Sequence, residues 1–250
     1  MEITEHLAVL GREGAALGDA AESAGPDAAV PTCPEWRVGD LVRHVGEVHR
    51  WATAHVRDRR LDPADSAADP TIVGPWPSDE ALIDWYREGH AALVSVLESA
   101  DPALECWSFL PAPSPLAFWA RRQCHETAIH RVDAESALGV VAPLDPVVAA
   151  DGIDELLVGF LGRRRQREIP EPLALQLVAE DVDRTWIAVL KPDVVEVVPA
   201  LPDGRVCAVK ATASDLDLLL WNRLPGSAVL VDGDPIVLET WARTVRVTWS

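Results

Sequence analysis

The period of the hydrophobic pattern changes once along the chain, and this change constrains the fold more than any other feature. Up to about residue 145, apolar residues recur at intervals of three and four, which keeps them on one face of an α-helix. After VVAPLDP (140–146), short β-branched runs alternate with charged, Gly or Pro turns. We therefore expect an α+β protein of two domains, with a helical domain over 1–145 and an α+β domain over 146–250.

The first part is expected to be a four-helix bundle. Its predicted helices cover 3–23, 37–56, about 78–100 and about 118–138. Ser78 is the expected N-cap of the third helix, and Gly139 follows the fourth as a C-cap residue. The segment 59–77 is rich in Asp, Pro and Ala and lacks periodicity, so it is expected to be a long surface loop. Four helices of this length are typical of a bundle.

The second part is expected to combine a sheet with two helices. The predicted strands are LALQLVA, TWIAVL, VVEVV, RVCAVKA, AVLVDGD and TVRVTW. A short helix is expected over 147–161, and ASDLDLLLWNR (213–223) is expected to form another helix with Ser214 as its cap. The chain contains no internal repeat.

Composition excludes several classes of partner. The 250 residues are 48% hydrophobic and 25% charged, which is enough to bury a substantial core. A formal net charge of -18 would repel phosphate backbones and anionic membrane surfaces, so neither nucleic acid nor a membrane is an expected partner. The start, MEITEHLAVLGREG, is acidic where a signal peptide is basic, and no apolar run reaches the roughly 18 residues of a membrane span. A cytoplasmic location is expected.

The four cysteines are widely scattered, at positions 33, 106, 124 and 207, and form no C-x-x-C pair. This pattern fits reduced thiols in a reducing compartment better than a disulfide framework or a cysteine-rich zinc site. We expect ordinary buried cysteines.

The segment RRQCHETAIHRVDAE (121–135) holds the candidate metal-ligating residues. His125 and His130 are five positions apart, so on a helix they point roughly 140° away from each other. Glu126 and His130 are four apart, which stacks them on one face and lets both reach the same ion. A third ligand must come from another helix, because catalytic zinc usually has three protein ligands and one open position. The second helix offers His44 and His49, again five apart, and helical angle prefers His44 only slightly.

The motifs WRVGDLVRH (36–44) and HETAIHRVDAE (125–135) resemble the DinB-like fold of the mycothiol-dependent maleylpyruvate isomerases and their relatives. The resemblance implies a metal-binding four-helix bundle followed by a small α+β domain of the sterol-carrier type. It also implies that the metal ligands are His44, Glu126 and His130. ASDLDLLLWNR is similar to a further family pattern whose arginine helps to bind or polarise an anionic substrate, which indicates Arg223. Asn222 stands where the family commonly has glycine.

For other residues near these motifs, the sequence predicts a role less specifically. Asp133 either holds His130 through its second ring nitrogen or is a solvated surface acid. Arg131 and Glu135 are expected to pair on the exterior of the helix. His125 is expected to face another helix or solvent. Trp51 and Trp119 are expected to pack in the core, with lining of a pocket as the alternative.

The resemblance implies a divalent metal, zinc first, that activates the small thiol mycothiol for attack on a small electrophile between the domains. Addition, rotation and elimination would make the protein an isomerase, whereas attack on a leaving group would make it an S-transferase. Two histidines and one carboxylate also accommodate iron, nickel or cobalt. One alternative is a thiol-independent hydrolase or lyase that uses metal-bound water. Another is a non-catalytic binding or stress protein with His49 as a fourth ligand.

Overall fold

The structure is a computed structural model that describes residues 1–65, 69–163, 165–169 and 171–245. It divides into two compact units, Met1–Ala142 and Pro143–Ser250, and each is described by itself. The division falls three residues before the position expected from the sequence, near 145.

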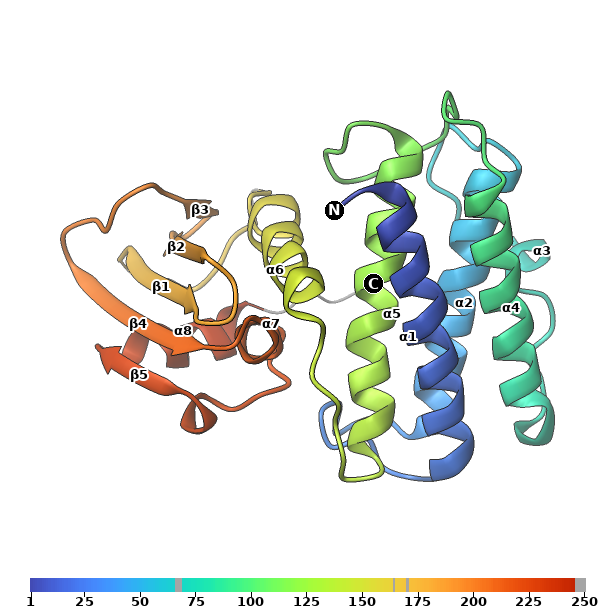
Figure 1. The fold of residues 1–250 in the computed structure, drawn as a ribbon, viewed down its shortest axis with the longest axis horizontal. Coiled ribbons are helices and arrows are strands. Elements are labelled where there is room, and N and C mark those ends of the chain that lie inside the picture. The colour runs from blue at the N-terminus through green and yellow to red at the C-terminus, as the bar shows by residue number, and fades with distance from the viewer. Residues whose placement is uncertain (66–68, 164, 170, 246–250) are drawn as a thin grey trace. The chain divides into compact units, whose positions relative to one another are not determined.

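The first unit contains four long helices that lie side by side (Figure 1). They are α1 (Ile3–Ala24), α2 (Val38–Arg57), α4 (Leu82–Glu98) and α5 (Pro115–Ser136). Two short helical segments, α3 (Pro70–Val73) and the 3-10 turn η1 (Asp79–Ala81), precede α4. The expected bundle is confirmed.

The apolar stripe of α1 points into the core of this unit. Leu10 and Leu17 are fully buried and Leu7 nearly so, whereas Ile3 at the helix start is only half-buried. Gly14 lies on the same stripe, and a Cβ there would stand 2.1 Å from Nε2 of His90 on α4. A glycine at this position therefore lets α1 and α4 approach each other closely.

Two boundaries differ from those expected. Helix α5 begins at Pro115, about three residues early, because the Ser114 side chain accepts a hydrogen bond from the Ala117 backbone N–H and proline suits the first helical position. The expected loop over 59–77 contains α3, whose first turn is capped by Asp69 through Thr71 N–H. Both α3 and α5 begin with an N-cap residue followed by proline, and these local features set the helix start where the hydrophobic period is weak.

In its described residues, the second unit contains a five-stranded sheet and helices. The strands are β1 (Leu173–Ala179), β2 (Arg184–Leu190), β3 (Val195–Val197), β4 (Arg205–Ala211) and β5 (Leu230–Gly233). The helices are α6 (Pro146–Asp154), η2 (Glu155–Phe160), α7 (Ala213–Leu220), η3 (Gly226–Ala228) and α8 (Ile236–Thr244). The expected α+β character of this unit is confirmed.

The sheet has the order β3-β2-β1-β4-β5. Strands β1 and β4 are parallel, with Leu173 opposite Arg205, and the other neighbours are antiparallel. Helices α7 and α8 both pack against β1 and β4 (Figure 1). The buried runs of β1 and β2 therefore form the centre of this unit.

The cap of α7 differs from the one expected. The Thr212 side chain, not Ser214, accepts a hydrogen bond from Asp215 N–H, while the Ser214 hydroxyl accepts one from Leu144 N–H. The helix begins one residue before Ser214, so Thr212 occupies the N-cap position. The predicted strand over 244–249 falls largely outside the described residues, and Thr244 itself ends α8.

None of the helices in the described parts of the chain is both long and apolar enough to cross a membrane. None of the four cysteines forms a disulfide; Cys106, Cys124 and Cys207 are buried as expected, whereas Cys33 is only half-buried.

Candidate metal centre

Helix α5 is polar yet buried almost all round. Its buried side chains include Arg122, Gln123, His125, Glu126, Thr127, His130, Arg131 and Asp133. Charged groups are almost never buried unless they are paired or bind a metal. The partners of these side chains therefore define the site.

Three candidate ligands, two from α5 and one from α2, come together. The Glu126 Oε1 atom lies 3.2 Å from His130 Nε2 on the same helix and 3.4 Å from His44 Nε2 on α2. One potential ligand atom from each residue lies within 4.8 Å of the other two. The structure thus brings His44, Glu126 and His130 into one cluster.

The spacing of this cluster fits a metal ion. With metal–ligand bonds of about 2.0–2.1 Å and tetrahedral angles, neighbouring ligand atoms lie about 3.3–3.4 Å apart. Glu126 Oε1 is buried and has no hydrogen-bond partner of acceptable geometry among the described residues. A buried carboxylate oxygen without a partner is costly, and a cation between it and the two imidazole nitrogens would satisfy it.

Asp133 holds the second ring nitrogen of His130. His130 Nδ1 lies 2.8 Å from Asp133 Oδ2, and Asp133 is fully buried. The alternative of a solvated surface acid is therefore wrong. Thr32 donates a hydrogen bond to the other carboxylate oxygen of Asp133 at 2.6 Å. Because a carboxylate only accepts, Nδ1 carries a proton, and in the neutral ring that a metal requires the Nε2 lone pair would point into the cluster.

Arg122 is the partner that sequence reasoning missed. Its Nη2 donates to Glu126 Oε2 at 2.6 Å, and both side chains are buried. Two features of the sequence could have predicted this pair. Arg122 and Glu126 are four positions apart, and their helix has no amphipathic period that would place either side chain in solvent.

The electrostatics of the cluster keep it charged. Burial alone would raise the pKa of Glu126, but Arg122, His130 and His44 together hold it well below its usual range. Burial likewise opposes the charged form of His130, but Asp133 and Glu126 raise its pKa to about 9. Without a metal, His130 is therefore protonated at neutral pH.

His49 and His125 lie outside the cluster. The His49 Nε2 atom is 2.9 Å from Thr127 Oγ1, and its ring packs beside Tyr86 and His90. Burial and the nearby His90 hold the pKa of His49 well below its usual range. The buried ring of His125 faces the His6 ring of α1 edge-on, with centroids 5.9 Å apart. His125 thus faces another helix.

Trp36 is the tryptophan that lies at the cluster. Its ring centroid is 5.0 Å from that of His44 and 6.1 Å from that of His130. Trp119 is fully buried, and its indole N–H donates to the Trp107 carbonyl, so its expected core role is confirmed. Trp51 packs against Trp119 with centroids 5.1 Å apart.

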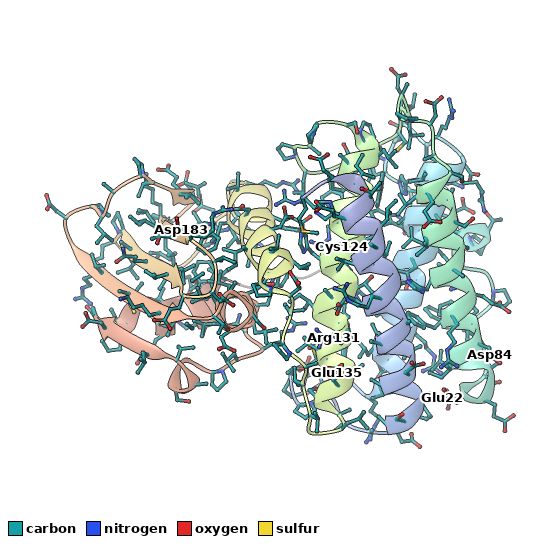
Figure 2. The ribbon with its side chains drawn as sticks, in the orientation of Figure 1. Glu22, Asp84, Cys124, Arg131, Glu135 and Asp183 are labelled. Carbon is teal, nitrogen blue, oxygen red and sulfur yellow. The ribbon has the colours of Figure 1, made fainter. Side chains whose placement is uncertain are left out.

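Arg131 and Glu135, both labelled on α5 in Figure 2, form the expected ion pair at 2.7 Å. The expectation that the pair lies on the helix exterior is wrong, because Arg131 is buried and also bonds Glu13 on α1 at 2.8 Å. This network joins α5 to α1 and has no atom in the cluster.

Arg223 belongs to the second unit, just after α7. One of its Nη atoms donates to the Trp221 carbonyl at 2.9 Å. Asn222 adopts a left-handed conformation with φ of 60°, and its side-chain amide donates to the Val245 carbonyl. Asparagine is one of the few residues besides glycine that tolerate this conformation.

The fold and the site define a class of two-unit proteins in which a helical bundle carrying a buried His–Glu–His cluster precedes an α+β unit. Residues 7–135 match the family described as the mycothiol maleylpyruvate isomerase N-terminal domain. Residues 147–240 match the corresponding C-terminal domain. The chain therefore belongs to the mycothiol maleylpyruvate isomerase family.

Solved structures agree with this assignment. A crystal structure of the mycothiol-dependent maleylpyruvate isomerase is 14% identical, with a TM-score of 0.64 over 93% of each chain. A mutant of that isomerase is 15% identical, with a TM-score of 0.63 over 93% of each chain. At such low identity, these likenesses establish the fold alone. Among curated proteins, none matches the chain.

Proposed function

We propose that this protein is an enzyme that holds a divalent metal, zinc first, on His44, Glu126 and His130. A low-molecular-weight thiol, mycothiol, would be its cosubstrate and a small electrophile its substrate. The reaction would be an isomerisation or an S-transfer. The family assignment supports the thiol and the reaction class.

The observation that carries the proposal is the position of Glu126 Oε1. This buried atom lies 3.2 and 3.4 Å from two imidazole nitrogens and has no hydrogen-bond partner among the described residues. Two neutral histidines and one carboxylate form a common donor set for catalytic zinc, which keeps a further position open.

The surrounding residues support this donor set. Asp133 orients His130 and fixes its tautomer, as carboxylates commonly do for histidines that bind a metal. His49, the candidate fourth ligand of a closed and non-catalytic site, has its Nε2 atom beside Thr127 Oγ1 instead. Among the residues that the structure describes, the cluster offers three ligating side chains, and such a set would leave a coordination position open.

The thiol must be supplied from outside the protein, because no cysteine belongs to the cluster. A bound zinc ion would favour the deprotonated form of a thiol at neutral pH. The free cysteines fit a reducing compartment such as the cytoplasm, where small thiols remain reduced.

Metal content and thiol dependence together test the proposal. We expect about one zinc per chain in purified protein, and loss of the metal in Glu126→Ala combined with His130→Ala. When mycothiol is added, the zinc ion should gain a sulfur ligand, which X-ray absorption at the zinc edge would detect. Full metal content in the double variant would sink the metal assignment. Turnover of electrophiles without any thiol would support the hydrolase or lyase alternative instead.

A further inference from the structure

Arg122 is a buried cation beside the candidate metal ligand Glu126. Its side chain is 2% exposed, and Nη2 lies 2.6 Å from Glu126 Oε2. Glu126 thus has Arg122 one helical turn before it and His130 one turn after it. A buried guanidinium is costly to desolvate, so its charge requires a close partner such as this carboxylate.

The two oxygens of Glu126 have different surroundings. Oε2 accepts the hydrogen bond from Arg122, while Oε1 faces the imidazole nitrogens of His44 and His130. A carboxylate that bound a metal through both oxygens would turn Oε2 toward the ion and weaken the contact with Arg122. It would also bring the ion closer to the guanidinium charge.

We propose that Arg122 is a positioning residue that restricts Glu126 to a single metal-binding oxygen and thereby keeps a coordination position open. This inference rests on the metal site proposed above. It concerns how the carboxylate binds the metal and does not depend on which thiol or electrophile the enzyme uses.

The charge of Arg122 has a second consequence. The guanidinium offsets the negative charge of Glu126, so the carboxylate donates less charge to the ion. A metal with a weaker carboxylate donor attracts an anion at its open position more strongly. Asp133 acts in the opposite direction on His130, because a carboxylate partner makes an imidazole a better donor.

Cobalt substitution tests the inference without an activity assay. Four-coordinate Co²⁺ absorbs visible light several-fold more strongly than five-coordinate Co²⁺, so the spectrum reports coordination number. We expect a strong spectrum from the wild type and a several-fold weaker one from Arg122→Met, in which Glu126 is free to use both oxygens. Arg122→Lys keeps a donor and a positive charge, so it should restore most of the intensity.

The matched control is Arg131→Met. Arg131 is also buried on α5 and paired with carboxylates, but those belong to Glu13 and Glu135. This variant should lower stability and keep the wild-type cobalt spectrum. An Arg122→Met spectrum identical to that of the wild type would overturn the inference and leave Arg122 a packing residue.

If circular dichroism shows that Arg122→Met does not fold, the number of zinc ligands in the wild type and in Arg122→Lys is measured instead, by X-ray absorption at the zinc edge. A zinc ion with four ligands, water included, supports binding through one oxygen of Glu126. A zinc ion with five ligands, both Glu126 oxygens among them, overturns the inference. Wild-type protein that binds no cobalt or zinc overturns both proposals. A strong cobalt spectrum without thiol-dependent turnover overturns only the thiol chemistry.

Discussion

The His130 imidazole donates through Nδ1 to the buried carboxylate of Asp133, with 2.8 Å between Nδ1 and Oδ2. This contact fixes which ring nitrogen faces Glu126, because the carboxylate can only accept. It also places a negative charge behind a candidate metal ligand. The orientation of His130 is therefore set by a residue one turn further along α5.

Replacing Asp133 by Asn should weaken metal binding about 10- to 100-fold. The amide removes the charge that strengthens His130 as a donor and no longer imposes the same tautomer. Competition with a chromophoric chelator measures the change. Thr32→Val, which removes the contacts of the Thr32 hydroxyl with Asp133 Oδ1 and Ser136 Oγ but keeps the Asp133 charge, serves as the control and should have a smaller effect. Equal affinities for wild type and Asp133→Asn would contradict the prediction.

The metal-free protein should lose stability as pH rises through about 9. The folded-state pKa of His130 is raised from 6.5 to about 9, so its protonation favours the folded state. This contribution is complete below pH 6.5 and lost above 9, and it amounts to at most about 3 kcal/mol. Thermal unfolding of wild type and His130→Gln, compared in chelator at pH 6 and pH 10, measures it. A difference between the two proteins that does not change with pH would count against this prediction.

The two histidines of α2 should differ in their effect on bound metal. His44→Ala removes one of the three clustered nitrogen or oxygen donors and should abolish stoichiometric binding. His49→Gln should keep the metal, because His49 Nε2 lies beside Thr127. Elemental analysis of both variants measures this directly. The reverse result, with metal lost only in the His49 variant, would show that the ligand set is wrong.

Arg131→Met should destabilise the protein by about 3 kcal/mol, the lower end for a broken buried ion pair, and leave one metal per chain. Removing Arg131 leaves the Oε2 atom of the buried Glu13 carboxylate without its guanidinium, while Arg12 still pairs with Oε1 at 3.1 Å. Urea denaturation gives the free energy of unfolding, and elemental analysis gives the metal content. A loss below about 1 kcal/mol would place this pair among weak surface ion pairs.

Arg223→Ala should lower kcat/KM about 10- to 100-fold for anionic electrophiles, since a hydrogen bond to a charged group contributes about 1.5–3 kcal/mol. Metal content should not change, because Arg223 is not one of the clustered residues. Turnover of matched anionic and neutral electrophiles with mycothiol checks the prediction. An equal loss with both substrates would indicate a structural role for Arg223.

Much of the fold could be predicted from local signals. The helical period of α1 and the short apolar runs of β1 and β4 are strong patterns, and the structure forms these elements where they occur. Cap choices were less predictable, as the Thr212 cap of α7 shows, because two neighbouring hydroxyl residues compete for one position. The start of α5 was missed because its hydrophobic period is weak there, and the Ser114 cap with Pro115 sets the first turn instead.

The sequence by itself determined that Glu126 and His130 share one face of a helix, because the helical period fixes which side chains stack. It did not determine whether His44 or His49 meets them, since two residues five positions apart point in different directions and only packing selects one. Tertiary structure placed His44 beside Glu126 and buried Arg122 and Asp133 with their partners. Contacts between helices depend on how the helices pack, and the period of a single helix carries no information about that.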